Sequence, residues 1–178
     1  HDSALGVYWE GIIRLLSPNA WSAQTDPAAL AEEFRRYGPM THEFTHLVLD
    51  YRTSGNYPHW FSEGLAQWEE YRVTGYLWVE PANSLDQDLY SLTALEDDFD
   101  GLPNVALAYR ESYLLTNYLF RLRGLEGLQA LIQDLEGGES FKAALQDVYH
   151  LDPQHLQADW LRWLGDNIEE LENGPHGN

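Results

Sequence analysis

Two histidines and a glutamate within five residues are the part of the sequence best suited to chemistry. The stretch GPMTHEFTHLVLDY places His42 and His46 four residues apart, with Glu43 directly after the first histidine. On an α-helix, side chains four residues apart lie on one face, so both imidazoles can reach the same metal ion. Glu43 then projects to the flank of that face, where a carboxylate can take a proton from an activated water molecule without binding the metal.

Two histidines alone do not complete such a site, because a catalytic zinc ion commonly has three protein ligands and leaves a fourth position for water. Glu63 follows the turn-rich loop TSGNYP on the next predicted helix, and it can complete the site if the two helices pack together. Asp50 lies one further turn along the first helix. Its side chain is short, which favours a place behind the ligands or in solvent.

Three more polar residues lie near the predicted ligands in the sequence. His59 is four residues before Glu63 and could share its helix face. We expect His59 on the substrate side and not as a ligand, because a fourth protein ligand would close the site. Glu69 and Glu70 continue into the charged end of the same helix, and we expect both on the solvated surface.

The elements that must position these residues can be read from helix start and stop signals. Asp26-Pro27 is an N-cap followed by proline, and it begins a helix that Gly38-Pro39 ends. A second helix begins near Pro39, and a third runs from Pro58 to Gly75. We therefore predict a strand-rich opening over residues 1–25, the active-site helices over 26–75 and a helical C-terminal part over 105–172. Within residues 76–104 we expect one short helix near SLTALEDDF, and a break at Gly124 within the C-terminal part.

These elements predict a single α+β domain over residues 1–178, mainly α-helical, with a small N-terminal strand element. Twenty-nine acidic and ten basic side chains give a net charge of -19, which repels phosphate backbones and excludes nucleic acid as a partner. The absence of cysteine excludes disulfides and thiolate metal ligands. We find no apolar run long enough to span a membrane. The chain begins with His1 and not with Met, as expected of a processed protein or a fragment of a longer one.

The motif and the residues after it resemble a known family of enzymes. His42-Glu43-x-x-His46 followed by Pro58-x-Trp60-x-x-Glu63-Gly64-x-Ala66 resembles the gluzincin metallopeptidases of the peptidase MA superfamily, which include thermolysin-like and aminopeptidase N-like enzymes. The resemblance implies a zincin-like catalytic domain that binds one Zn²⁺ ion through the two histidines and Glu63. It implies that Glu43 is the general base and acid, that the substrate is a peptide or protein, and that the location is extracellular or in the cell envelope.

The resemblance extends to a later helix and to the start of the chain. The segment AYRESYLLTNYLFRLRG, residues 108–124, resembles the aminopeptidase N-like segment in which a tyrosine stabilises the oxyanion. The matching residue is Tyr109, and Tyr113, one turn later, is the alternative donor. The opening ALGVYWEGIIRLL resembles the part of the family sheet whose edge strand pairs with an extended substrate.

Other functions stay open from the sequence. A non-catalytic or latent zincin-fold binding module, part of a longer protein, would carry the same ligands. A substrate other than a peptide would also suit the same metal and base, because these groups do not select the substrate. The residues favour neither endopeptidase nor aminopeptidase activity.

Overall fold

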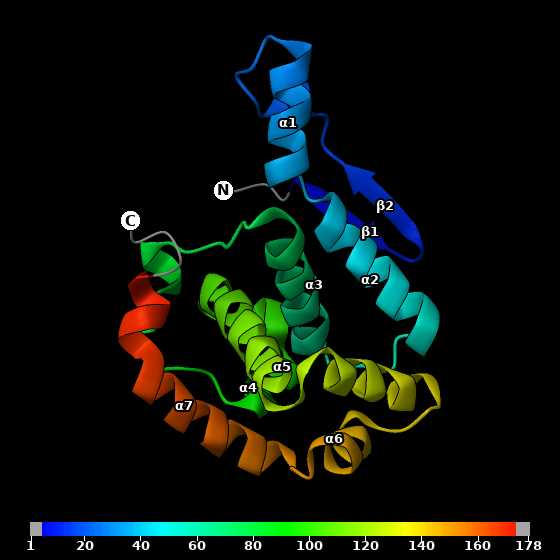
Figure 1. The fold of residues 1–178 in the computed structure, drawn as a ribbon, viewed down its shortest axis with the longest axis vertical. Helices are drawn as coiled ribbons and strands as arrows, with labels where there is room; N and C mark the ends of the chain where they lie inside the picture. The colour runs from blue at the N-terminus through cyan, green and yellow to red at the C-terminus, as the bar shows by residue number, and fades with distance from the viewer. Residues whose placement is uncertain (1–4, 174–178) are drawn as a thin grey trace.

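A β-hairpin and seven α-helices make up the described part of the chain, residues 5–173 of the computed structural model (Figure 1). The mainly helical architecture with a two-stranded sheet confirms the predicted fold class at this level. The predicted single domain also includes residues 1–4 and 174–178, which lie outside the described residues. The elements are β1 (Gly6–Trp9), β2 (Ile12–Leu15), α1 (Pro27–Tyr37), α2 (Met40–Thr53), α3 (His59–Thr74), α4 (Leu92–Asp97), α5 (Val105–Glu136), α6 (Phe141–Tyr149) and α7 (Pro153–Asn173), with 3₁₀ turns at Pro18–Ala20, Pro81–Asn83 and Phe99–Gly101.

The first three helices begin and end where the sequence predicts. Asp26 accepts a hydrogen bond from the backbone N–H of Ala29 and caps α1, with proline in its first turn. α3 ends at Gly75, which has the left-handed conformation that glycine adopts without strain. The loop between α2 and α3 reverses the chain, so α3 returns along α2 (Figure 1). As a result, α3, which carries the predicted ligand Glu63, packs against α2, which carries the two histidines.

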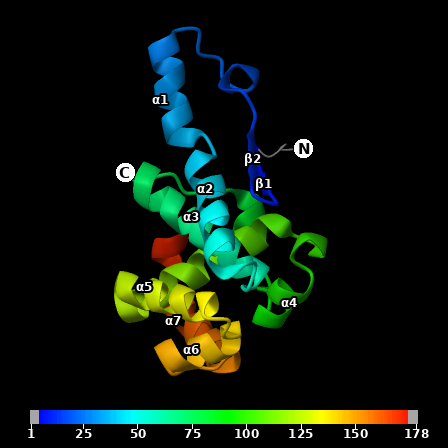
Figure 2. The ribbon, with the colours of Figure 1, turned by 90° about the vertical axis from the view of Figure 1, so that its right-hand side faces the viewer.

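The hairpin of β1 and β2 lies beside α2 (Figure 2). Its two-residue turn is formed by Glu10 and Gly11, both with positive φ, which matches the right-handed twist of antiparallel strands. Among the described residues, β1 pairs with β2 on one side and has no strand on its other side. The edge of β1 that does not pair with β2 therefore faces the helix that carries the two histidines.

α3 passes through the core and packs most extensively on α5. Its apolar side chains Trp60, Phe61, Leu65 and Trp68 are all buried. At Gly64 the two helices approach so closely that a Cβ atom would lie 2.1 Å from the carbonyl oxygen of Ser112. Glycine at this position lets α3 and α5 make contact through their backbones, which fixes the depth at which the neighbouring Glu63 sits.

The C-terminal helices also contribute to this core. α5 contains the predicted break at Gly124, whose backbone is not helical, and the chain bends there. α6 and α7 then wrap around the lower and outer sides of α5 (Figure 1), with Trp160 of α7 fully buried. No helix within residues 5–173 is long and apolar enough to cross a membrane, as the sequence predicts.

Glu111 of α5 is a carboxylic acid buried inside the helical core. Its side chain is 0% exposed, and one oxygen accepts a hydrogen bond from the backbone N–H of Tyr90. Burial raises the pKa of Glu111 to about 8, and the hydrogen bond from Tyr90 offsets only part of this effect. Glu111 therefore keeps its proton in the folded protein at neutral pH.

We expect Glu111→Gln to remove a pH dependence of stability. Above about pH 4.5 the unfolded chain loses the Glu111 proton, whereas the folded chain keeps it until about pH 8. Wild-type stability should therefore fall as pH rises through this window, by up to about 1.4 kcal/mol per pH unit from this group. Urea unfolding across the window should show the variant gaining stability relative to wild type as pH rises. Glu126→Gln, exposed on the same helix, is the control; identical pH profiles for all three proteins would contradict the assignment.

Candidate metal centre

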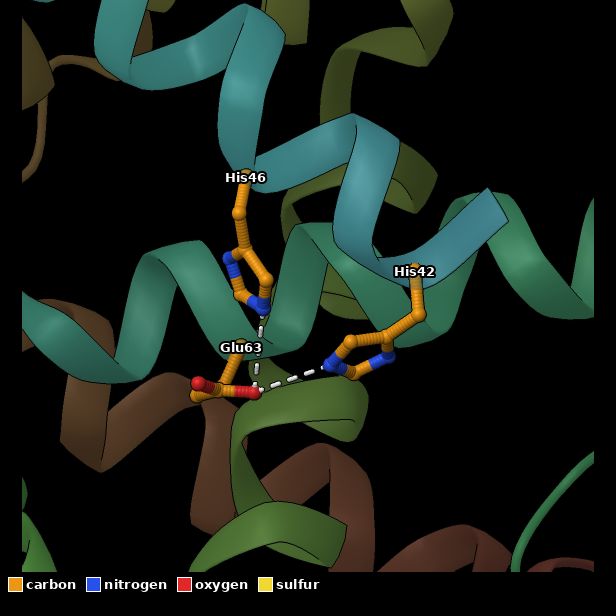
Figure 3. A group of neighbouring side chains, drawn as sticks. All are labelled: His42, His46 and Glu63. Atoms are coloured by element: carbon orange, nitrogen blue, oxygen red, sulfur yellow. Dashed lines mark hydrogen bonds and ion pairs between the residues drawn. The ribbon is translucent and has the colours of Figure 1, made fainter. Parts of the chain in front are cut away.

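Three side chains predicted as ligands converge between α2 and α3. The Oε2 atom of Glu63 lies 3.2 Å from Nε2 of His42 and 3.5 Å from Nε2 of His46. Figure 3 shows one ring nitrogen of each histidine directed at this carboxylate. The donor atoms of the three residues all lie within 4.8 Å of one another. The packing of α3 on α2 thus places Glu63 beside the two histidines, as the sequence predicts.

These separations fit a metal ion. Ligand atoms placed about 2.1 Å from a tetrahedral zinc ion lie roughly 3.4 Å from each other, which is close to both measured distances from Glu63. Two imidazole nitrogens and one carboxylate oxygen also form a donor set that zinc accepts. The cluster is therefore compatible with a metal ion without rearrangement of the helices.

The outer nitrogens of the two imidazoles are also held in place. Nδ1 of His46 lies 2.7 Å from the hydroxyl of Ser62, and Nδ1 of His42 lies 3.6 Å from the carboxylate of Glu70. Such partners fix the ring orientation and direct Nε2 to a metal. The prediction of a solvated surface is wrong for Glu70, whose side chain is only 12% exposed, because α3 turns this residue inward toward His42. Glu69 is more exposed and pairs with Arg72 along the helix surface.

The charges of the cluster favour a cation between its members. Burial by itself would lower the pKa of His42, but hydrogen bonds to Glu63 and Glu70 outweigh it and raise the pKa to about 10. For Glu63, burial acts to raise the pKa, yet its contacts with three histidines hold it well below the ordinary value. Glu63 is thus ionised, and His42 holds a proton at the place where a metal ion would bind. Metal binding must release that proton.

Glu43 lies on the flank of the cluster, buried against β1. Burial raises the pKa of Glu43, while the nearby imidazoles and a hydrogen bond from the backbone N–H of Tyr8 act in the opposite direction. A Cβ atom on Gly6 would lie 2.9 Å from the Glu43 carboxylate, so glycine lets the strand pass directly beside it. The strand therefore sets the position of the carboxylate predicted to act as the base.

The structure places the remaining candidates around this centre. His59 lies on the cleft wall, where Nε2 is 3.3 Å from Oε1 of Glu63 and the ring packs on Phe99. Asp50 contacts neither histidine; it accepts hydrogen bonds from the phenols of Tyr8 and Tyr57. His59 therefore lines the cleft and also contacts Glu63. Asp50 lies behind the ligands.

An open cleft of about 810 Å³ leads to the cluster. It is bounded by β1, α2, α3, the segment after α3 and the start of α5. Tyr109 lines the cleft, and burial together with the charges of Glu63, Asp100 and Glu43 raises its pKa, so the phenol remains a hydrogen-bond donor. Tyr113 is 6% exposed, packs against Tyr71 in the core and does not line the cleft.

Fold and site together define a helical domain that presents a His-His-Glu metal-ligand cluster at the base of an open cleft. The model of the Peptidase MA superfamily matches residues 9–166, and the chain belongs to this superfamily. This membership suggests a peptidase and agrees with the coarse family prediction. Searches of curated proteins and of solved structures gave no significant match.

Proposed function

We propose that the protein is a zinc-dependent metallopeptidase of the gluzincin type, with His42, His46 and Glu63 as ligands. The observation that carries this proposal is the convergence of three donor atoms within 4.8 Å at the base of a cleft, beside the buried carboxylate of Glu43. A bound zinc ion would polarise the scissile carbonyl and lower the pKa of a water molecule in the site. The remaining steps belong to residues of the chain.

Glu43 is the proton carrier in this proposal. Its pKa is raised by burial, which strengthens the carboxylate as a base toward water. The same carboxyl group, once protonated, can give its proton to the departing amine. The backbone N–H of Tyr8 supports this role, because it helps to hold a carboxylate that lines the cleft.

The open edge of β1 supports an extended peptide as the substrate. Leu16 donates its backbone N–H to the carbonyl of Leu5, so by the alternation of an antiparallel pair the amides of Gly6 and Tyr8 point away from β2 and toward α2. The amide of Tyr8 already donates to Glu43, so the main-chain hydrogen bonds left for a substrate strand at this edge come from the amide of Gly6 and the strand carbonyls. Among the described residues that line the cleft there is no lysine or arginine to bind a free C-terminal carboxylate.

Tyr109 is proposed as the donor to the oxyanion that forms when water adds to the carbonyl. We expect Tyr109→Phe to lower the turnover number by about 10²-fold, since one preorganised O–H donor is lost, with zinc affinity unchanged. Tyr113→Phe is the matched control and should leave turnover at the wild-type level, because that phenol lies in the core. Steady-state kinetics on one cleaved peptide would measure both. Equal losses in the two variants would contradict the assignment.

Removal and restoration of the metal tests the proposed function as a whole. Protein stripped with a chelator should fail to cleave an unfolded protein or a mixed peptide library, and one equivalent of Zn²⁺ should restore cleavage, followed by mass spectrometry. Stoichiometric zinc without any cleavage would instead favour the non-catalytic binding module. A protein that binds no zinc would overturn the proposal.

A further inference from the structure

A second groove, separate from the cleft over the metal ligands, lies between α2, α3 and α5. Its volume is about 520 Å³. One wall is the face of α2 that carries Met40, Phe44 and Val48, and another is formed by side chains from residues 125–132 of α5. The buried Trp68 of α3 lies at its base. None of the described residues that line this groove also lines the cleft.

The apolar side chains along the groove are exposed and adjacent to one another. Phe44 is 55% exposed, Met40 46% and Leu125 45%. Met40, Phe44 and Val48 are spaced four residues apart, so they form one continuous row on α2. Single apolar residues scattered over a surface are ordinary, whereas a contiguous apolar groove marks a binding surface.

The charged side chains at the groove are already paired within the protein. Among the described residues that line the groove, only Arg52 and Glu69 carry a charge. Arg52 pairs with Glu136, and Glu69 pairs with Arg72. An occupant of the groove therefore has to supply apolar groups, and a charge placed inside the groove would lose its hydration without gaining a partner.

The length and the walls of the groove fit an α-helix. From Met40 to Arg52 the wall formed by α2 is about 18 Å long at 1.5 Å per residue, which matches roughly three helical turns. Two helices that form the sides of a groove accept the side-chain ridge of another helix between them. A helix bound in this way uses apolar residues at positions i, i+3 or i+4, and i+7.

The charge of the whole chain selects among the occupants of an apolar groove. Each chain carries a net charge of -19, so two copies repel each other, and an anionic lipid surface repels the chain as well. A helix whose apolar face is flanked by lysine or arginine is attracted instead. We propose that the groove between α2, α3 and α5 binds an amphipathic, basic α-helix of a partner protein. This binding requires no metal ion and is independent of the proposed peptidase activity.

Fluorescence anisotropy of a labelled model peptide tests this proposal on the full, metal-free chain. The probe is a helix of about 14 residues of leucine and lysine, with the leucines at i, i+3, i+4 and i+7 on one face. We expect saturable binding with a dissociation constant in the micromolar range. A peptide of the same composition, with the leucines spread around the helix, should bind at least about tenfold more weakly. Equal binding of the two peptides would show attraction by net charge alone and would contradict the proposal.

Phe44→Glu and Tyr51→Glu separate the groove from the rest of the exposed surface. Both residues are exposed aromatics on α2, but Tyr51, which is 87% exposed, does not line the groove. Each variant adds one negative charge, so attraction by net charge would increase equally in both. Phe44→Glu should instead weaken peptide binding by about tenfold or more, because it removes an apolar anchor, whereas Tyr51→Glu should stay within about twofold of wild type. Thermal unfolding checks that both variants are folded. Equal affinities in the two variants would refute the assignment of the groove.

Two further measurements test other occupants. Sedimentation equilibrium of the protein without peptide should show a monomer; a dimer that Phe44→Glu dissociates would assign the groove to a second copy of the chain. Vesicles of phosphatidylcholine and phosphatidylglycerol should not bind the wild type; binding that Phe44→Glu abolishes would assign the groove to a lipid surface. Either of these two assignments would overturn the proposal.

Discussion

Glu43→Gln is expected to retain one zinc ion per chain and to lose hydrolysis by about 10³-fold or more, the range that a general base contributes. Glutamine has the same shape as glutamate, and its side-chain oxygen can still accept the hydrogen bond from the backbone N–H of Tyr8. The amide cannot take a proton from water, however, nor deliver one to the departing amine. The loss should therefore fall on the turnover number and leave substrate binding nearly unchanged.

Three measurements check this result on one preparation. Elemental analysis gives the zinc content, thermal unfolding reports whether the fold is intact, and mass spectrometry of an unfolded substrate gives the rate of cleavage. Activity within tenfold of wild type, in a sample free of contaminating peptidase, would remove Glu43 from the mechanism. Loss of zinc together with activity would instead assign Glu43 to the ligand set.

Glu63→Gln is expected to have the second large effect, the loss of the metal itself. The carboxylate supplies the negative charge that lies 3.2 Å and 3.5 Å from the two imidazole nitrogens, and an amide oxygen in its place is neutral. We expect zinc affinity to fall by about 10³-fold or more, which corresponds to roughly 4 kcal/mol of binding free energy. Cleavage should disappear at metal concentrations that saturate the wild type.

Glu69→Gln is the matched control for this variant. Glu69 lies on the same helix, but its carboxylate pairs with Arg72 at the surface and takes no part in the cluster. Zinc titration of both variants should therefore separate a ligand from a general change in the charge of α3. Wild-type affinity in Glu63→Gln would exclude Glu63 as a ligand and would direct attention to Glu70, whose carboxylate lies 3.6 Å from His42.

The sequence predicted the ligand cluster because most of its geometry is local. The four-residue spacing of His42 and His46 places both rings on one helix face, whatever surrounds the helix. Helix ends were equally local: Asp26 caps α1 with its own side chain, and Gly75 ends α3 by adopting a left-handed conformation. Only the position of Glu63 beside the histidines depended on the packing of two helices. That packing followed from a loop long enough to reverse the chain.

Glu70 and Ser62, which contact the ring nitrogens of the two histidines, were missed by the sequence reasoning. Glu70 lies seven residues, or two helical turns, after Glu63, and that spacing could have indicated a shared face. Its place next to a run of charged residues favoured the surface instead. Ser62 carries no such signal, because a serine directly before Glu63 projects to a different side of an isolated helix. Its contact with His46 arises from the way in which α3 crosses α2.

By itself the sequence determined which residues could hold a metal, since helical periodicity, capping and turn chemistry act over a few neighbouring residues. Tertiary structure decided how that centre is supported. The close approach of α3 and α5 at Gly64, the strand that holds Glu43 through Tyr8, and the contact between Ser62 and His46 all join residues from separate elements. Such contacts follow from the packing of whole helices and a hairpin, which no local pattern specifies.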